Sequence, residues 1–164
     1  MVIGCSGSGK STFSRTLHQK TQLPIIHLDQ AYWKPNWIES SKEEWRSIVT
    51  KLASKESWIM DGNYSGTWDL RIPRADTIIF LDKSTRVCLY RVLKRIFQNY
   101  GKVRPDMVPG CPERLDAQFL HYVLVYNLTR RAKNLKRLEE LKGEKQIFIF
   151  QKEKEISSFL NSFT

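Results

Sequence analysis

The most constraining feature of this chain is the segment GCSGSGKST, which runs from Gly4 to Thr12. It matches the P-loop pattern G-x-x-x-x-G-K-[ST], and it lies between a short apolar stretch and a segment of helical composition. The glycines of such a loop let backbone N–H groups turn inward, which forms a concave phosphate site at a helix N-terminus. A ligand-free glycine-rich turn is the plain alternative, and the adjacent Lys10 and Ser11 argue against it. The segment therefore predicts the strand–loop–helix unit of a P-loop NTPase.

The motif also assigns roles to its residues. Lys10 is expected to reach the β and γ phosphates of ATP and to act in catalysis, and the Ser11 hydroxyl is expected to ligate Mg²⁺. The residues expected to bind ATP are Gly4, Ser6, Gly7, Ser8, Gly9, Lys10, Ser11 and Thr12. GTPases, motor ATPases and small-molecule kinases share this loop, so the reaction has to be inferred from the rest of the chain.

Short apolar runs alternate with helical patterns along the 164 residues. The runs are 1–3, 23–28, 57–62, 75–82 and 145–150. Continuous apolar strands of this kind are typical of a parallel sheet covered by helices on both faces. The stretch 113–141 is helical in pattern, with an interruption near Asn127. No linker or repeat divides the chain, so a single α/β domain covering 1–164 is expected.

Two acids follow predicted strands. Asp29 lies at the end of the run 23–28, at the edge where open α/β sheets bind ligands. It is expected to hold Mg²⁺-bound water, or to orient an acceptor hydroxyl and take its proton. The alternative is that Asp29 only caps a turn. Asp61 ends the run 57–62 and is the second candidate for the Mg²⁺ site.

Several large side chains near these acids have two interpretations each. Trp33 and Trp37 either stack against the ring of an acceptor or cover apolar surface. Arg71 and Arg74 either meet a charge on the acceptor or form structural ion pairs.

A basic helical stretch precedes a loop rich in glycine and proline. Arg91, Lys94, Arg95 and Gln98 follow i, i+3, i+4, i+7 spacing, and the segment GKVRPDMVPGCP comes next. This combination is typical of a lid that closes over a triphosphate and brings positive charge to it. Further candidates for this basic cluster are Arg104, Arg114, Arg130 and Arg131. The alternative is a basic face exposed to solvent.

The composition limits the environment and the partners. Lys and Arg total 27 and Asp and Glu total 17, a formal net charge of +10 that attracts nucleic acid and small phosphorylated ligands alike. The cysteines are Cys5, Cys88 and Cys111, with no CxxC pair, so neither a disulfide framework nor a zinc site is expected. No apolar run reaches the roughly 20 residues of a membrane helix, and the N-terminal residues do not have the pattern of a signal peptide. A cytoplasmic protein with no membrane partner is expected.

Four segments in order, GCSGSGKST, HLDQAYWKPNW, DGNYSGTWDLR and RPDMVPGCPERLD, resemble the small P-loop proteins known as DNA topology modulation proteins, which are relatives of adenylate kinase. The resemblance covers nearly the whole chain. It implies a nucleoside/nucleotide kinase fold with three α/β/α layers, a five-stranded parallel sheet of order 2-3-1-4-5 and a small helical lid at about 100–115. It also implies ATP binding through the loop Gly4 to Thr12.

The same resemblance assigns further residues. Asp61 matches the Asp of the adenylate kinase motif DGFPR, and Arg91 and Arg95 resemble the arginines near the lid that contact ATP. We expect Arg95 to act in catalysis as well. After Gly62, however, this chain has Asn63-Tyr64-Ser65 in place of Phe-Pro-Arg. The arginine that grips a monophosphate is absent, so AMP is not the expected acceptor.

Three functions fit these observations. The leading hypothesis is an ATP-dependent phosphotransferase that moves the γ-phosphoryl group of Mg-ATP to an unidentified small acceptor, either nucleoside- or nucleotide-like or another metabolite. The second is an ATP-regulated DNA-binding protein that modulates DNA topology, although the sequence contains no recognisable DNA-reading element. The third is a nucleotide switch that hydrolyses ATP slowly without an acceptor. Arginines that converge on the P-loop favour the first, and a flat basic stripe favours the second. No feature of the sequence indicates an oligomeric state.

Overall fold

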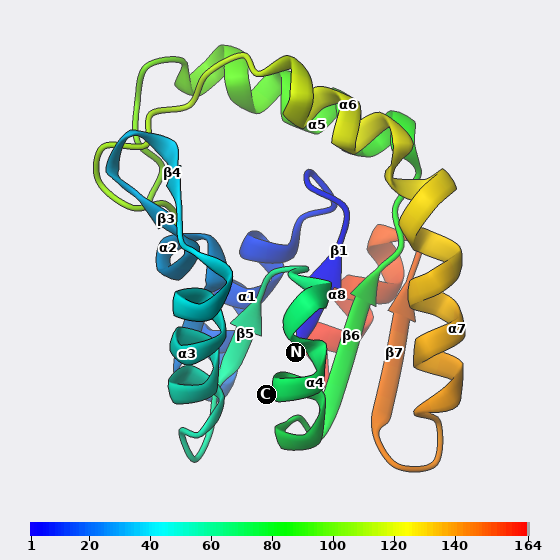
Figure 1. The fold of residues 1–164 in the computed structure, drawn as a ribbon. Helices are drawn as coiled ribbons and strands as arrows, with labels where there is room; N and C mark the ends of the chain where they lie inside the picture. The colour runs from blue at the N-terminus through cyan, green and yellow to red at the C-terminus, as the bar shows by residue number, and fades with distance from the viewer. Residues whose placement is uncertain (164) are drawn as a thin grey trace.

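A five-stranded parallel sheet lies at the centre of the computed structural model, which describes residues 1–163 (Figure 1). The strands are β1 (Val2–Gly4), β2 (Ile25–His27), β5 (Ile59–Asp61), β6 (Thr77–Leu81) and β7 (Gln146–Phe150). Their spatial order is β2-β5-β1-β6-β7, and each neighbouring pair is parallel. Counted along the chain, this is 2-3-1-4-5, so the expected sheet and its order are confirmed.

Helices cover both faces of this sheet, which gives the three layers (Figure 1). One face carries α3 (Lys42–Ala53), α4 (Trp68–Arg71) and α7 (Ala132–Glu140), and the other carries α1 (Lys10–Thr21) and α8 (Glu153–Asn161). Successive strand residues point to opposite faces. Ile3 therefore packs with Trp68 and Leu138, whereas its neighbour Val2 packs with Phe13 and Ile156. Burial on both sides explains why the strands are continuous apolar runs.

Two further helices cross above the carboxyl edge of the sheet (Figure 1). They are α5 (Thr85–Asn99) and α6 (Ala117–Tyr126), and their contact buries Cys88, Val92 and Val123. A π-helical turn, Asn127–Arg131, joins α6 to α7, so the expected interruption near Asn127 is confirmed. Between α5 and α6 the chain has no helix or strand, apart from an isolated bridge between Tyr100 and Glu113.

The segment after β2 forms short elements that the sequence pattern did not predict. They are α2 (Leu28–Tyr32) and an antiparallel pair, β3 (Trp33–Lys34) and β4 (Ile38–Glu39), around the 3-10 turn Pro35–Trp37. We call β3, the turn and β4 the hairpin. Two more 3-10 turns, Ser65–Thr67 and Ile72–Arg74, flank α4.

Hydrogen bonds tie this hairpin to the loop between α5 and α6. The backbone N–H of Asn36 donates to the carbonyl of Gly110 (2.9 Å), and the indole N–H of Trp37 donates to the carbonyl of Pro112 (3.1 Å). The Cys111 thiol donates to the carbonyl of Lys34 (3.2 Å). Figure 1 shows this loop reaching down to the hairpin. The loop and the hairpin therefore close the space above α2 together.

Arg71 is fully buried, at 0% exposure, and holds the turn that follows β5. Its guanidinium donates to the backbone carbonyls of Gly62 (3.1 Å), Asn63 and Tyr64 (2.9 Å). The interpretation of Arg71 as a cation that meets the acceptor is therefore wrong, because the guanidinium is buried and its two Nη atoms donate to backbone carbonyls. Arg74 is exposed and donates to the carbonyl of Ala53 (3.4 Å), so it is also directed away from the expected site.

The Arg71→Met variant is expected to lower the free energy of unfolding by about 3 kcal/mol, because buried carbonyls lose their donors. Urea unfolding measures this change. Arg74→Met is the matched control, since it removes an exposed arginine and is expected to change stability by about 0.5 kcal/mol or less. Equal effects of the two substitutions would contradict the role given to Arg71.

Among residues 1–163, no helix has the length and apolar character that a membrane span requires.

Candidate functional site

The P-loop connects β1 to the first turn of α1, as the motif predicts. The Nζ of Lys10 folds back over the loop and donates to the carbonyl of Cys5 (3.1 Å). Gly7 has φ 82°, and a Cβ there would lie 2.3 Å from the carbonyl oxygen of Cys88 in α5. Only glycine fits at this position, and the loop consequently packs directly against the helix that leads to the lid.

Gly7→Ala is expected to weaken ATP binding by about tenfold or more, because a left-handed φ and a backbone clash together cost about 1–3 kcal/mol. Equilibrium titration with Mg-ATP measures the dissociation constant. Gly66→Ala is the matched control, because a Cβ at Gly66 meets no atom within 4 Å. Unchanged affinity in Gly7→Ala would mean that the loop conformation does not matter for the nucleotide.

A cavity of about 530 Å³ lies between the P-loop, α2, the hairpin and the helices α5 and α6. It is lined by two P-loop residues, by aromatic rings and by charged side chains: Ser6, Lys10, Asp29, Tyr32, Trp33, Trp37, Glu39, Gly62, Asn63, Tyr64, Ser65, Arg95, Arg104, Met107, Glu113, Arg114, Asp116, Gln118, Phe119, Tyr122 and Arg130. Asp29, which the sequence placed after a strand, and arginines from the distant basic segments thus line one space, whereas Asp61 is not among the lining residues. We call this space the acceptor cavity.

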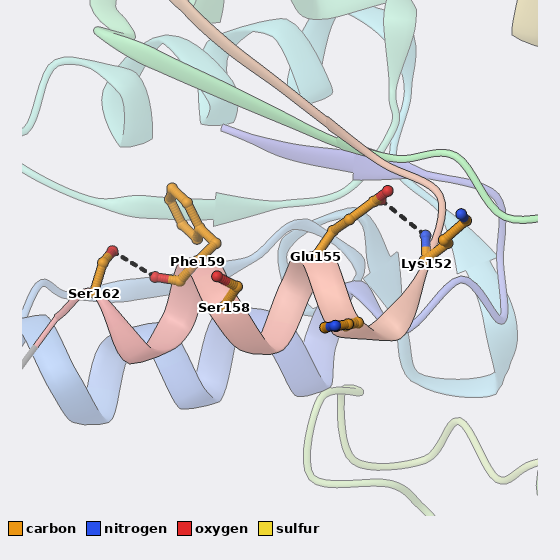
Figure 2. A pocket seen from close by; sticks show the side chains of 6 residues that line it. Lys152, Glu155, Ser158, Phe159 and Ser162 are labelled. Atoms are coloured by element: carbon orange, nitrogen blue, oxygen red, sulfur yellow. Dashed lines mark hydrogen bonds between the residues drawn. The ribbon is translucent and has the colours of Figure 1, made fainter.

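A second hollow of about 640 Å³ lies on the surface along α8 (Figure 2). Polar side chains that line this hollow form hydrogen bonds with the backbone at the two ends of α8. The Glu155 carboxylate accepts from the backbone N–H of Lys152 (2.9 Å), and the Ser162 hydroxyl donates to the carbonyl of Phe159 (2.7 Å). No P-loop residue lines this hollow within 1–163, so the acceptor cavity is the candidate site.

Asp29 lies in the first turn of α2, directly after β2, and lines the acceptor cavity. Its Oδ1 accepts a hydrogen bond from the hydroxyl of Tyr64 (2.6 Å). Desolvation raises the pKa of Asp29 above its ordinary value, the Tyr64 hydrogen bond opposes the shift, and the charge of Asp61 adds to it. A carboxylate with a raised pKa, facing a cavity beside a P-loop lysine, is suited to accept a proton.

Asp61 occupies a different environment. It ends β5, is 5% exposed, and its Oδ2 lies 2.9 Å from Nδ1 of His27 on the neighbouring strand. The register of β2 and β5 places these two residues opposite each other. Asp61 does not line the acceptor cavity, and within 1–163 no group of three His, Cys, Asp or Glu residues is arranged to hold a metal ion. An Mg²⁺ site here would therefore depend on hydroxyl, water and phosphate oxygens besides a carboxylate.

The lid loop brings an additional acid to the P-loop. The carboxylate of Asp106 lies near the Ser11 hydroxyl and pairs with Arg104 (2.8 Å). Burial alone would raise the pKa of Asp106, but the charge of Arg104 and the neighbouring hydrogen-bond donors hold it below the ordinary value. Asp106 was not among the site residues predicted from the sequence. The only signal for it was its place in the segment RPDMVPGCPERLD.

The two arginines expected to contact ATP occupy different places. Arg91 lies over the P-loop, where its Nη1 donates to the carbonyl of Ser8 (3.4 Å), and its Nη2 pairs with Glu153 (2.8 Å). Arg95 lines the acceptor cavity instead and donates to Glu113 (3.0 Å). Burial lowers the pKa of Arg95. One basic stripe on α5 therefore places Arg91 at the P-loop and Arg95 at the cavity.

Of the other basic candidates, three join the cavity and one does not. Arg104, Arg114 and Arg130 line the cavity. The guanidinium of Arg131 instead donates two hydrogen bonds, both of 2.7 Å, to the carboxylate of Asp82, the residue directly after β6. The arginines at the P-loop and around the cavity therefore converge on one region and do not form a flat basic stripe.

Aromatic rings form the wall of the cavity opposite the P-loop. Trp33 meets Trp37 edge to face, with ring centroids 5.3 Å apart, and meets Tyr32 in the same way at 5.1 Å. Tyr32 also packs against Tyr64 at 4.9 Å. The guanidinium of Arg114 lies over the ring of Trp37, 5.5 Å from its centroid. We call Tyr32, Trp33 and Trp37 the aromatic wall.

Solved structures show the same fold. The chain is similar to "a putative kinase" from Chloroflexus aurantiacus, with a TM-score of 0.51 and 16% identity over 98% of this chain and 94% of that one. It is also similar to deoxyadenosine kinase from M. mycoides, solved with bound dCTP, with a TM-score of 0.48 and 14% identity over 98% and 96% of the two chains. The first likeness and the sheet order establish an α/β P-loop NTPase fold.

Sequence comparison gives a relationship of a different kind. No protein-family model matches the chain. The uncharacterized protein YqaC of Bacillus subtilis (strain 168) is 33% identical over 130 residues, which cover 77% of this chain and 71% of that protein. Identity at this level over such a share of both chains shows that the protein belongs to the same family as YqaC.

Proposed function

We propose that this protein is an ATP-dependent phosphotransferase that moves the γ-phosphoryl group of ATP to a hydroxyl of a small acceptor held in the acceptor cavity. One observation carries the proposal. Lys10 of the P-loop and the carboxylate of Asp29 line the same cavity as the aromatic wall. A phosphate donor on the loop and an acceptor against the wall would therefore lie side by side, and positioning is the main source of rate in phosphoryl transfer.

ATP would bind through the loop Gly4 to Thr12, which leads into the N-terminus of α1. Lys10 and Arg91 would contact its phosphates. In support, Arg91 already lies against the carbonyl of Ser8, and its Nη1 would be 3.6 Å from a Cβ at Gly9. Arg95, which faces the cavity, would meet the group during transfer.

The oxygen atoms beside the P-loop fit Mg²⁺. Hydroxyl and carboxylate oxygens are the ligands it prefers, and the Ser11 hydroxyl is within hydrogen-bonding reach of the Asp106 carboxylate. Ser11 would hold the ion, with Asp29 and Asp61 acting through bound water. When bound, Mg²⁺ neutralises charge on the β and γ phosphate oxygens.

The acceptor step follows from the position of Asp29. Its carboxylate would take the proton of the acceptor hydroxyl as that oxygen forms a bond to the γ phosphorus. The bond from the γ phosphorus to the bridging oxygen breaks, and ADP leaves with that electron pair. Lys10 and Arg95 would stabilise the charge on the transferred group.

The lid is part of this proposal. Residues 100–115 would close over both substrates within the single domain 1–164. Its present contacts support closure, because the amide of Gln30 in α2 donates to the carbonyl of Pro105 (2.7 Å) and Asp106 reaches Ser11. Closure would exclude water, which otherwise competes with the acceptor.

Membership of the DNA topology modulation family is also proposed here, on the strength of the segment RPDMVPGCPERLD, which supplies Arg104, Asp106 and Glu113 around the cavity. A DNA-binding role is the less favoured alternative. It would use the net charge of +10, but Arg91 lies at the loop, and Arg95, Arg104, Arg114 and Arg130 line the cavity.

The test is ADP release from Mg-ATP in the presence of nucleosides, nucleoside monophosphates and other hydroxylated metabolites. Stimulation by one compound, recovered as its phosphorylated product, is the expected result. If no compound stimulates ADP release and DNA binding persists at about 200 mM salt and responds to ATP, the phosphotransferase proposal is wrong and the DNA-binding alternative stands.

A further inference from the structure

Two cations that line the acceptor cavity, Arg95 and Arg104, are paired with carboxylates of the segment 100–115. Glu113 is 5% exposed, and its Oε1 accepts a hydrogen bond from Nε of Arg95 (3.0 Å) and lies 2.9 Å from Nη2 of the same guanidinium. Its Oε2 lies 2.7 Å from Nε of Arg104, whose Nη1 pairs with Asp106 (2.8 Å). Two arginines thus face two carboxylates, and this cluster carries no net charge.

Of the other arginines that line the cavity, Arg114 lies 3.4 Å from Asp116. Arg130 lies over the ring of Tyr122, 5.4 Å from its centroid, and pairs with no carboxylate among residues 1–163. Arg71 is buried, and its guanidinium donates to a backbone carbonyl of the protein. Within 1–163 the acceptor side of the cavity therefore presents no pair of arginines free of carboxylates.

We propose that the acceptor is an uncharged alcohol that carries a flat ring, and that Glu113 makes the cavity reject the phosphate esters of such alcohols. This inference rests on the proposed phosphotransferase function. A phosphate monoester would have to displace a buried carboxylate from Arg95 and Arg104, or lie beside it with like charge. Either arrangement is unfavourable, since removing a partner from a buried pair leaves an uncompensated charge.

The ring is inferred from the aromatic wall. Trp33 and Tyr32 present adjoining rings to the cavity, and Trp37 is held in place by its hydrogen bond to Pro112 and by the guanidinium of Arg114. Rings set edge to face in this way can add a further ring in the stacked or tilted geometry that aromatic groups prefer. The hydroxyl of such a ligand would point to Asp29, on the P-loop side of the cavity.

The experiment compares matched pairs, each an alcohol and its own monophosphate: adenosine and AMP, cytidine and CMP, thymidine and TMP, and pyridoxine and pyridoxine 5′-phosphate. Glycerol and glycerol 3-phosphate form the pair without a ring. ADP release gives kcat/KM for each compound, and quenching of tryptophan fluorescence gives its affinity. We expect a ring-bearing alcohol to be accepted and its monophosphate to be about tenfold or more poorer.

Glu113→Gln is expected to shift this preference toward the monophosphate by about tenfold, because Arg95 and Arg104 lose their carboxylate partner. Glu56→Gln, at an exposed position, is the matched control and is expected to leave the preference unchanged. If Glu113→Gln fails to fold, the comparison within the wild-type protein decides.

Each outcome separates this inference from the function on which it rests. If the wild-type protein prefers any monophosphate to its alcohol, the role proposed for Glu113 is wrong, although the protein is still a phosphotransferase. If it prefers glycerol to the ring-bearing alcohols, the proposal that the acceptor carries a flat ring is wrong. Failure of every pair to stimulate ADP release overturns the phosphotransferase itself, and the inference with it.

Discussion

Replacing Lys10 by alanine is expected to lower acceptor-dependent ADP formation by about 10²–10³-fold in kcat, the usual cost of removing one group that stabilises transition-state charge. Lys10 is the cation that both belongs to the P-loop and lines the acceptor cavity. The only hydrogen bond that its side-chain ammonium makes within 1–163 goes to the carbonyl of Cys5 in the same loop. The variant should therefore fold normally and bind ATP more weakly, while transfer is almost lost.

Single-turnover transfer with saturating ATP measures this effect separately from binding. Lys51→Ala is the matched control, because it removes an exposed lysine at the end of α3, remote from the loop. The control is expected to keep the wild-type rate. A Lys10→Ala protein that transfers phosphate at more than about one tenth of that rate would exclude the P-loop as the phosphate site.

Asp29→Asn is expected to have two opposite effects: a loss of about 10²–10⁴-fold in kcat and an increase in stability at neutral pH. The first follows because an amide cannot take the proton of the acceptor. The second follows from the raised pKa of Asp29, which desolvation causes. The folded protein binds this proton more tightly than the unfolded chain does. The stability that comes from this group is fully present below the unfolded pKa, and it is lost as the pH rises through the folded pKa.

Asparagine is uncharged at every pH, so the variant does not carry the cost of a buried charge, and its Oδ1 can still accept from Tyr64. The thermal midpoint of Asp29→Asn should exceed that of the wild type at neutral pH, and the difference should shrink in acid. The wild-type kcat/KM should rise with pH through a pKa above the ordinary aspartate value. Asp76→Asn, at an exposed position, is the control. A lower midpoint together with wild-type activity would show that Asp29 is a turn cap rather than a base.

Much of the fold was predictable because it depends on local patterns. The spacing of Gly4, Gly9 and Lys10 requires a strand before the loop and a helix after it, and the continuous apolar runs require a sheet buried on both faces. Asp29 was also predictable as a cavity residue, because it follows a strand at the carboxyl edge of a parallel sheet. These inferences needed only the order of elements along the chain.

The side chains of the lid were less predictable. Asp106 and Glu113 lie in a segment without helix or strand, so no periodicity indicates where they point, and their positions depend on contacts with Ser11 and Arg95. Arg71 was misassigned because a cation near a strand end resembles a ligand group, whereas its true partners are backbone carbonyls, which leave no trace in the sequence.

Arg91 and Arg95 differ for a geometric reason. They lie on one face of α5, but one helical turn separates them by about 6 Å along the axis. That distance is enough to place one guanidinium at the P-loop and the other at the cavity. Spacing in a sequence predicts a shared face, and it does not predict which neighbour each position on that face will meet.

The hydrogen bonds from the hairpin to Gly110 and Pro112 have a thermodynamic consequence. The hairpin, which would cover the acceptor, and the loop between α5 and α6, which would cover ATP, are joined by these bonds. Neither can open far unless it moves the other or the bonds break. Each substrate would then stabilise the same closed arrangement. Because such linkage is reciprocal, the factor by which ATP tightens acceptor binding must equal the factor by which the acceptor tightens ATP binding.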